Sequence, residues 1–216
     1  MPVGGGFSSG GGAAQVGNAG AQRDAYVSPP AADADGFRTS TATSTGAATI
    51  STWNGAQAAG LDDPRSFTLT LAASAGAYNL TAWTLTYTDT DGAQRTATAT
   101  PTTANGGETL TFASGGTVVC GTVPVSLARP AQANNSGAFT LGFGDELGLK
   151  GGAPVTASGA SFPILLSYYV DGAPTAVDTG LVATNATASP PNGMFLPTDV
   201  PDDSRSYDVV YLLAVP

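Results

Sequence analysis

From residue 61 onward, short runs of the chain alternate apolar side chains with threonine or serine, and this pattern limits the possible folds most. In residues 66–72 every second residue is Phe or Leu, and from Trp83 to Thr88 every second residue is Trp, Leu or Tyr. A period of two places alternate side chains on opposite faces of an extended strand. The runs therefore predict β-strands that are each buried on one face.

Turn signals separate these runs at regular intervals. Asp89-Thr90-Asp91-Gly92 stands between residues 81–88 and a Thr/Ala run at 94–100, and an Asp-Gly pair in this position is a strong hairpin signal. Pro124 restricts its own run to a sheet edge or a strand break. Further strands are expected at residues 108–113, 117–127, 138–143, 164–170, 176–183 and 207–215. This spacing predicts an all-β fold, an antiparallel β-sandwich or barrel-like domain.

The composition supports the same fold class. Charged residues make up 11% of the chain, against roughly 25% in an average soluble domain. Lys150 is the only lysine, and Glu108 and Glu146 are the only glutamates. Amphipathic helices draw on lysine and glutamate, whereas β-branched residues favour strands.

The N-terminal region differs from the rest of the chain. Eight of the first twenty residues are glycine, and such a segment cannot bury enough apolar surface to offset the entropy cost of ordering it. We therefore predict an extended, glycine-rich N-terminal arm over residues 1–60 that becomes ordered against neighbouring subunits. The β-rich domain is expected at residues 61–216, with two possible sub-halves at 61–150 and 151–216.

Within the predicted arm, residues 21–60 read as a transition. Ser28-Pro29-Pro30 is extended because proline disfavours helix in itself and in the residue before it. The threonine-rich segments 37–45 and 47–53, with Gly46 between them, are expected to pair with each other as edge strands.

The residue inventory argues against an enzyme. Histidine is absent, which removes the commonest general base, the commonest metal ligand and the usual partner of a serine or cysteine nucleophile. The single cysteine, Cys120, lies in a strand-like run and is expected to be a small buried apolar residue. No catalytic, cofactor-binding or metal-binding residue is predicted.

Several acidic groups in the sequence are candidates for a metal-binding or catalytic site. Asp89 and Asp91 resemble the start of a calcium loop, but the later bidentate glutamate is missing, so a plain hairpin turn is favoured. The adjacent pair Asp145-Glu146 is expected to point to opposite faces of a strand, which does not suit acid–base catalysis. A weak surface cation site is the alternative interpretation of the three aspartates Asp199, Asp202 and Asp203.

Two other patterns have a structural and a functional interpretation. Gly142-x-Gly144 is too short for a dinucleotide fingerprint, and we place it between strands. Phe162, Tyr168 and Tyr169 suit a sugar-binding or partner-binding patch, although core or interface packing is favoured. Because the two tyrosines are adjacent on a strand, one is expected to face the core and the other the surface.

The charge balance limits the partners. The formal net charge is −9, which opposes binding to nucleic acid or to an anionic membrane surface. No basic region precedes an apolar segment at the N-terminus, and no apolar run approaches the length of a membrane span. Synthesis and folding in the host cytoplasm are therefore expected.

From residue 61 to the C-terminus, the order of several short motifs resembles a family of tailed-bacteriophage virion structural proteins, of the capsid cement, decoration or head-fibre kind. The motifs are Asp62-Asp63-Pro64-Arg65, Thr88-Asp89-Thr90-Asp91-Gly92, Gly142-Phe143-Gly144-Asp145-Glu146-Leu147-Gly148-Leu149, Val170-Asp171-Gly172, and Asn192-Gly193 followed by Pro197-Thr198-Asp199-Val200-Pro201-Asp202 and Tyr207-Asp208-Val209. The resemblance implies a virion component without enzymatic activity or cofactor.

An accessory protein on the capsid surface is the favoured function, because an extended arm can add main-chain hydrogen bonds across a junction between major capsid subunits. Residues 1–60 would bind the shell and stabilise the head, and residues 61–216 would form an outer knob, as a homotrimer suited to a hexagonal lattice. The expected capsid-binding residues of the arm are Val3, Phe7, Val16, Arg23, Tyr26, Val27 and Phe37. The alternative is a head-fibre or tail adhesin module that binds host surface glycan.

Overall fold

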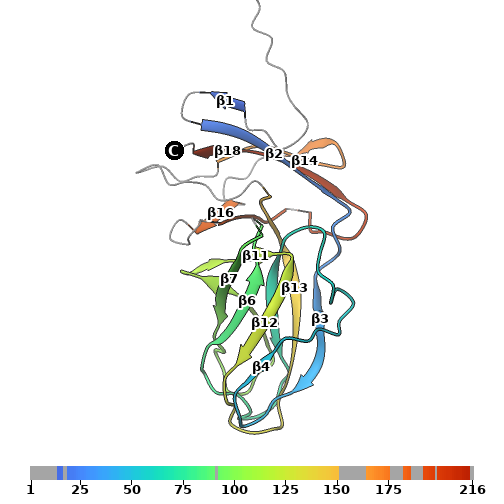
Figure 1. The fold of residues 1–216 in the computed structure, drawn as a ribbon. Helices are drawn as coiled ribbons and strands as arrows, with labels where there is room; N and C mark the ends of the chain where they lie inside the picture. Colours follow the sequence, from blue (N-terminus) through green and yellow to red (C-terminus); the bar gives the residue numbers. More distant parts are fainter. Residues whose placement is uncertain are drawn as a thin grey trace, which may run out of the picture.

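The computed structural model describes residues 14–16, 19–90, 92–150, 164–175, 182–185, 192–197 and 199–214. The described residues form strands, turns and loops without a helix, and the strand pairings are antiparallel. The prediction of an all-β fold is therefore confirmed. Figure 1 shows two packed sheets forming an elongated body, with a third sheet lying across one end.

Three sheets make up the architecture. The six-stranded sheet has the order β10 (Thr117–Val118), β9 (Ala113–Ser114), β7 (Gln94–Ala99), β6 (Trp83–Thr88), β12 (Val123–Arg129), β4 (Ala48–Ile50). The seven-stranded sheet has the order β11 (Cys120–Gly121), β5 (Arg65–Leu71), β13 (Ala138–Gly148), β17 (Asn192–Phe195), β16 (Val182–Asn185), with β3 (Asp33–Ala42) beside β13 and β8 (Glu108–Thr111) beside β5. The five-stranded sheet has the order β1 (Ala14–Val16), β2 (Ala19–Val27), β18 (Ser206–Ala214), β14 (Ile164–Val170), β15 (Ala173–Thr175).

The six- and seven-stranded sheets enclose the larger of two hydrophobic cores. Trp83, Leu85 and Tyr87 of β6 are buried, and the threonines between them are only half-buried, as the alternating pattern predicts. Trp83 packs edge-on against Phe139 of β13, with ring centroids 5.0 Å apart. The predicted hairpin at Asp89–Gly92 is confirmed, because β6 and β7 pair from Thr88↔Gln94 onward.

The second core lies between the five-stranded sheet and the far end of the seven-stranded sheet. We call it the tyrosine core, and its buried residues are Tyr26, Leu147, Leu149, Tyr168, Val170, Phe195, Tyr207, Val209 and Tyr211. Burial of so many aromatic rings gives this small core a large apolar area for its size.

Strand β13 belongs to both cores. On one side it pairs with β5 along most of its length, and on the other it pairs with β3 as far as Phe143 and with β17 from Leu147. The predicted strand at 138–143 is thus correct but too short. Gly142-x-Gly144 lies inside this strand, so its placement between strands was wrong.

The single strand expected at residues 117–127 is divided into β10, β11 and β12, which belong to two different sheets. The other differences concern pairings between distant segments. Segments 37–45 and 47–53 were expected to pair with each other, but β3 pairs with β13 and β4 pairs with β12. Pro124 lies in a strand that has neighbours on both sides, and the register shifts beside it between Pro124 and Ser126. The break expected at Pro124 is therefore present, and β4 pairs with β12 only from Leu127 to Arg129, so beside Pro124 that side of the strand has no partner among the described strands.

The arm predicted over residues 1–60 also differs from the structure. Residues 1–13 lie outside the described residues, but β2, β3 and β4 contribute residues 19–50 to all three sheets. Tyr26 and Phe37 are fully buried, one in each core. Over residues 19–60 the chain is thus part of the folded body, because aromatic residues give this stretch the apolar surface that the glycine-rich segment lacks.

Candidate functional site: a polar junction between the two cores

Two of the motifs noted in the sequence meet where the larger core ends and the tyrosine core begins. Phe143 of β13 pairs with Phe67 of β5, but the next pair is Leu147 with Arg65, so β13 carries extra residues here and bulges. Gly144 leaves room for the Ser66 hydroxyl within the bulge, because a Cβ atom at this position would lie 2.7 Å from Ser66 Oγ. The backbone N–H of Gly148 then donates to the carbonyl of Pro64 at 2.8 Å.

Arg65 fills the centre of this junction and is completely buried. Its two terminal nitrogens donate to the carbonyl oxygens of Pro30 and Gly144, and its guanidinium carbon lies 5.2 Å from the centroid of the Phe143 ring. Oδ1 of Asp145 lies 3.9 Å from Nη2 of Arg65. The Nε atom of Arg65 has no hydrogen-bond partner among the described residues. Burial lowers the pKa of Arg65, and Asp145 opposes that shift. A planar, forked cation can hold two carbonyl groups in a fixed geometry.

Ser66 and Cys120 lie beside Arg65 and are equally inaccessible. The Ser66 hydroxyl donates to the carboxylate of Glu146. Cys120 is buried, as predicted, and its Sγ is 3.9 Å from the carbonyl oxygen of Glu146. Burial, followed by the negative charge of Glu146, raises the pKa of this thiol well above its ordinary value. A protonated, buried thiol is a poor nucleophile.

Lys150 joins the five-stranded sheet to the larger body. Its Nζ lies 2.5 Å from Asp63 Oδ1, donates to the carbonyl of Ala25 at 2.7 Å, and sits 4.6 Å from the centroid of the Tyr26 ring. Its backbone N–H donates to Asp24 Oδ2 at 2.6 Å. The single lysine of the chain therefore links β2 to the segment that precedes β5.

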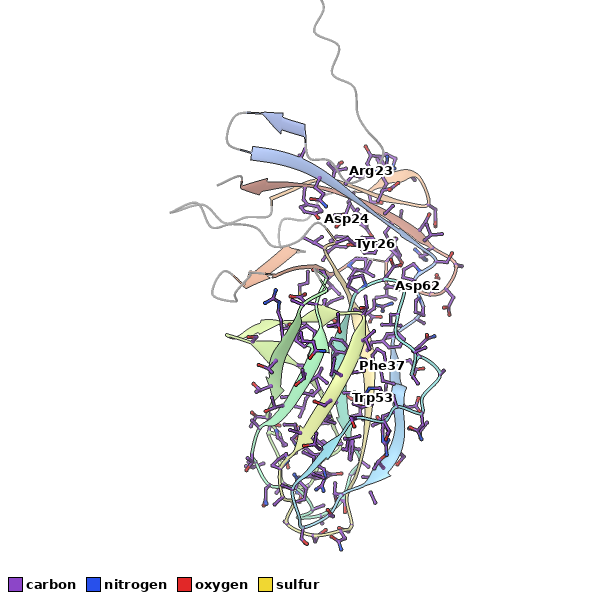
Figure 2. All side chains as sticks on the ribbon, viewed as in Figure 1. Arg23, Asp24, Tyr26, Phe37, Trp53 and Asp62 are labelled. Atoms are coloured by element: carbon purple, nitrogen blue, oxygen red, sulfur yellow. The ribbon has the colours of Figure 1, made fainter. Side chains whose placement is uncertain are left out.

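Two tyrosines complete this link. The Tyr211 hydroxyl donates to Asp24 Oδ2 at 2.7 Å, and the Tyr26 hydroxyl donates to the carbonyl of Gly148 at 2.8 Å. Burial, followed by the charge of Asp24, raises the pKa of Tyr26 well above its ordinary value. Figure 2 shows Asp24 and Tyr26 on the side of β2 that faces the larger body, with Arg23 on the opposite side.

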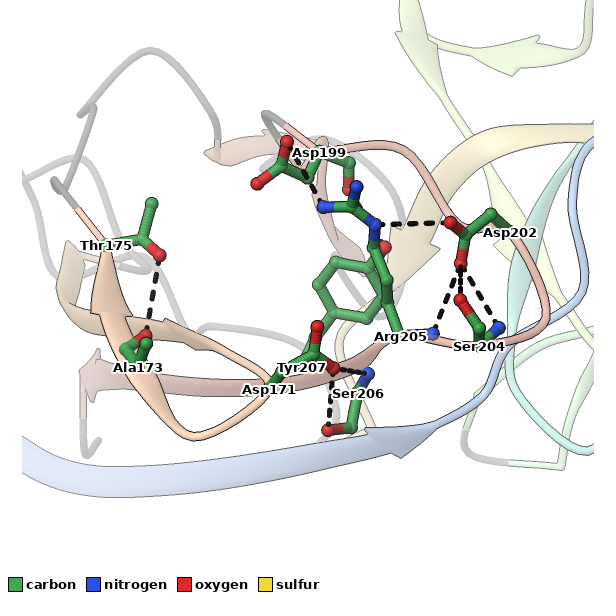
Figure 3. Close-up of polar contacts among 9 residues, drawn as sticks. All are labelled: Asp171, Ala173, Thr175, Asp199, Asp202, Ser204, Arg205, Ser206 and Tyr207. Atoms are coloured by element: carbon green, nitrogen blue, oxygen red, sulfur yellow. Dashed lines mark hydrogen bonds and ion pairs between the residues drawn. The ribbon is translucent and has the colours of Figure 1, made fainter.

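A second polar cluster holds the turn at Asp171 against the loop that leads into β18 (Figure 3). Arg205 contacts Asp199 and Asp202 at 3.2 Å each. Asp202 also accepts hydrogen bonds from Ser204, which lower the pKa of its carboxyl. The Asp171 carboxylate accepts the backbone N–H of Ser206 at 2.8 Å. The guanidinium of Arg205 therefore already neutralises two of the three carboxylates that a weak cation site would use.

The predicted aromatic patch is divided between two environments. Tyr168 is buried, packs edge-on against Phe195 at 4.8 Å and stacks on Tyr207. Tyr169 is half-buried on the opposite face of the sheet, as the adjacent-residue argument predicted. Phe162 lies outside the described residues. The hydroxyl of Tyr168 has no hydrogen-bond partner among the described residues, although it is buried.

The residues predicted for capsid binding also have different environments. Val3 and Phe7 lie outside the described residues, and Val16 is in β1, where its side chain is not described. Arg23 and Val27 are exposed on the outer face of β2. Tyr26 and Phe37 fill this chain's own cores, so in this fold neither is available to another subunit.

The chain uses each of its basic side chains internally, and all seven lie in described residues. Their partners are Asp208 for Arg23, Thr41 and Thr52 for Arg38, Pro30 and Gly144 for Arg65, Asp89 for Arg95, Ser44 and Gly46 for Arg129, Asp63 for Lys150, and Asp199 and Asp202 for Arg205. A site for a phosphate or a carboxylate ligand would have to break one of these contacts.

Sequence reasoning noted most of these residues without predicting the junction. Asp63 and Arg65 belonged to one motif, and Asp145 and Glu146 to another, but nothing in the sequence indicated that the two motifs meet. The role of Asp24 was missed altogether. The one available signal was composition, because a chain with a single lysine is expected to use it for a specific contact.

Among the described residues, no group of three or more acidic or cysteine side chains is arranged to hold a metal ion. The same residues contain no helix long and apolar enough to cross a membrane. No protein-family model, curated protein or solved structure matches the chain. The geometry of the junction therefore carries the functional argument.

Proposed function

We propose that the protein is a non-enzymatic accessory subunit, of the cement or decoration type, that binds between major capsid subunits of a bacteriophage head and stabilises it. The observation that carries this proposal is the use of the ionisable groups at the junction. Arg65, Glu146, Lys150 and Asp63 are all tied to neighbouring parts of the chain, so they fix the fold instead of facing a substrate.

The short motifs whose order resembles that of virion proteins also contact one another in the structure. Asp62–Arg65 and Gly142–Leu149 meet at the junction, and the turn at Asp171 meets the loop before β18. Segments far apart in the sequence are thus held together by short polar motifs. Such motifs suit a rigid structural subunit, because they restrict internal motion.

Attachment to the shell is assigned to the N-terminal segment. Residues 1–13 precede β1, which forms one edge of the five-stranded sheet. Strand β1 pairs only with residues 19–21 of β2, and no described strand pairs with residues 22–27 on that side. A segment from a neighbouring subunit can add main-chain hydrogen bonds at an edge of this kind. The attachment segment is therefore narrower than residues 1–60.

The proposal is tested with heads of the encoding phage from which this protein has been removed. Wild-type protein and a variant lacking residues 2–13 are added back, and bound protein is measured after sedimentation of the heads. We expect the wild type to bind and the deletion variant to lose at least about tenfold in affinity, or about 1.4 kcal/mol. Far-UV circular dichroism confirms that the variant is folded.

A deletion of residues 2–35 would not serve, because it removes β2 and with it Tyr26 of the tyrosine core. Undiminished binding of the shorter deletion variant contradicts the role of the N-terminal segment. Failure of the wild type to bind the heads contradicts the proposed function, and binding to host glycans in the same preparation would favour the adhesin alternative.

A further inference from the structure

The end of the body opposite the five-stranded sheet is formed by four loops without a charged residue. They are residues 43–47 between β3 and β4, 72–82 between β5 and β6, 100–107 between β7 and β8, and 130–137 between β12 and β13. Figure 1 shows these loops together at the lower end of the body. We call this surface the charge-free end. In a chain of net charge −9, a whole end without Asp, Glu, Lys or Arg needs an explanation.

Two charged residues, Arg129 and Glu108, border the charge-free end, and the side chain of each forms hydrogen bonds with the backbone of these loops. Arg129 is buried and donates to the carbonyl oxygens of Ser44 and Gly46 at 2.7 Å each. The Glu108 carboxylate accepts the backbone N–H of Thr102 at 3.0 Å. Both groups therefore hold loops in place.

The loops are also fixed to one another. The side chain of each of their four asparagines forms a hydrogen bond with the backbone of a loop other than its own, at 2.9–3.1 Å. The pairs are Asn79 with Ala131, Asn105 with Gly76, Asn134 with Gly76, and Asn135 with Thr45. The hydroxyls of Ser74 and Ser136 add a further contact at 2.9 Å. A surface that is already rigid loses little conformational entropy when it binds a partner.

The exposed side chains of the charge-free end suit close contact with protein. The exposed apolar residues are alanines, such as Ala75, Ala131 and Ala133, together with Leu80, which is 57% exposed. Alanine has no side-chain rotamers to lose and allows backbones to approach closely. The only aromatic residue in these loops, Tyr78, is buried, so the end lacks the exposed ring on which a sugar would stack.

We infer that copies of this chain associate with one another through the charge-free end. Two copies that each carry a net charge of −9 repel when their carboxylate-bearing surfaces approach. Contact through this end brings no carboxylate of the four loops to the interface, and screening over about 8–10 Å weakens the repulsion between the carboxylates that lie beyond it. The inference concerns the isolated chain, so it is independent of the proposed attachment to a capsid.

The test is the oligomeric state of the full chain by sedimentation velocity. At about 100 µM, a dimer with a Kd of about 10 µM leaves only about a fifth of the chains monomeric, so we expect a dimer or trimer of the 21.2 kDa chain to predominate. Leu80→Asp and Ala133→Asp each place a carboxylate at the interface, and we expect each to weaken association by about tenfold or more. Both positions are exposed, so at concentrations where the wild type is also monomeric the variants should have the wild-type melting temperature.

Val200→Asp is the matched control, because Val200 is 50% exposed and lies in the loop before β18, near the other end of the molecule. We expect this variant to associate like the wild type. Raising the salt concentration should leave association unchanged or strengthen it, since no ion pair crosses the interface. A monomeric wild type, unchanged association of both loop variants, or dissociation at high salt would each overturn the inference.

Discussion

At the scale of single residues, Arg65 shows how this chain uses a scarce charge. A buried guanidinium costs desolvation energy, which is offset only when it is paired and hydrogen-bonded in good geometry. Arg65 obtains this compensation from the carbonyl of Pro30 before β3 and, within β13, from the carbonyl of Gly144 and the nearby carboxylate of Asp145. The same residue therefore fixes the segment before β3, the start of β5 and the bulge in β13.

Replacement of Arg65 should be far more damaging than replacement of an exposed arginine. Arg65→Ala leaves two carbonyl groups unpaired in a buried site and is expected to lower the free energy of unfolding by about 3–5 kcal/mol. Arg65→Lys should recover little, because one ammonium group cannot reproduce the forked geometry. Urea denaturation followed by tryptophan fluorescence measures both effects.

Arg23→Ala is the control, since it breaks the ion pair with Asp208, in which the Arg23 side chain is 67% exposed. Its expected cost is below about 1 kcal/mol. Equal losses for Arg23→Ala and Arg65→Ala would show that Arg65 does not support the junction.

Residue environments that depend on local pattern were predictable, and those that depend on distant partners were not. The burial of Cys120 follows from its apolar character within a strand-like run, and the opposite orientations of Tyr168 and Tyr169 follow from the period of a strand. The contacts of Arg65 with Gly144 and of Lys150 with Asp24 join segments separated by 79 and 126 positions. No periodicity or turn signal specifies such a pairing.

At the scale of elements, β13 decides the arrangement of the molecule, because it lies between β5 and β3 and then between β5 and β17. Its glycines made the sequence pattern look like a break between strands. In the structure Gly142 serves close packing, since a Cβ atom there would lie 1.9 Å from the carbonyl oxygen of Asp33. The glycine at position 142 therefore indicates that another backbone packs closely against β13.

Gly142→Ala should consequently disrupt the pairing of β13 with β3. The contact is with backbone atoms that cannot move aside, so we expect a loss of about 3 kcal/mol or more in the free energy of unfolding. The same substitution at Gly46 meets no atom within 4 Å and should change stability by less than about 1 kcal/mol. Thermal unfolding of the two variants gives the comparison, and a Gly142→Ala protein as stable as Gly46→Ala would contradict the assigned packing.

The positions of strands could be predicted from the sequence better than the strands with which they pair. Alternation located β5 and β6, because a half-buried strand shows its period directly, and the turn signal at Asp89–Gly92 located β7. The partners of β3 and β4 were mistaken, since the residues that pair with β3 lie 96–110 positions further along the chain and those that pair with β4 lie 77–81 positions further. Proximity in sequence favours hairpins, and the buried aromatic Phe37 outweighs that preference by anchoring β3 in the larger core.

At the scale of the whole molecule, two cores of different composition respond differently to pH. The chain has no histidine, so no side chain has an ordinary pKa between about pH 5 and 8. The tyrosine core instead carries buried phenols. Burial raises the pKa of Tyr207 to about 12 and raises that of Tyr168 still further.

The direction of the pH effect follows from these shifts. An unfolded tyrosine loses its proton near pH 10, whereas the folded tyrosines retain theirs, so folding favours the protonated form. The stability that this provides is complete below about pH 10 and is lost as the pH rises toward the folded values. We therefore expect constant stability from about pH 6 to 9, followed by cooperative loss of the tyrosine core above about pH 10.

Tyr168→Phe isolates this effect, because the hydroxyl that it removes has no hydrogen-bond partner among the described residues. At pH 7 the variant should be as stable as the wild type or more stable, since an unsatisfied buried hydroxyl costs about 1–3 kcal/mol. Its alkaline unfolding midpoint, followed by circular dichroism together with the absorbance of ionised tyrosine, should move to higher pH. Tyr207→Phe gives the contrast, because it also loses the hydrogen bond to the Asp199 carbonyl and should be weakened at pH 7. A Tyr168→Phe protein that is destabilised at pH 7, or that unfolds at the same alkaline pH as the wild type, would show that buried phenols do not set the upper pH limit of the fold.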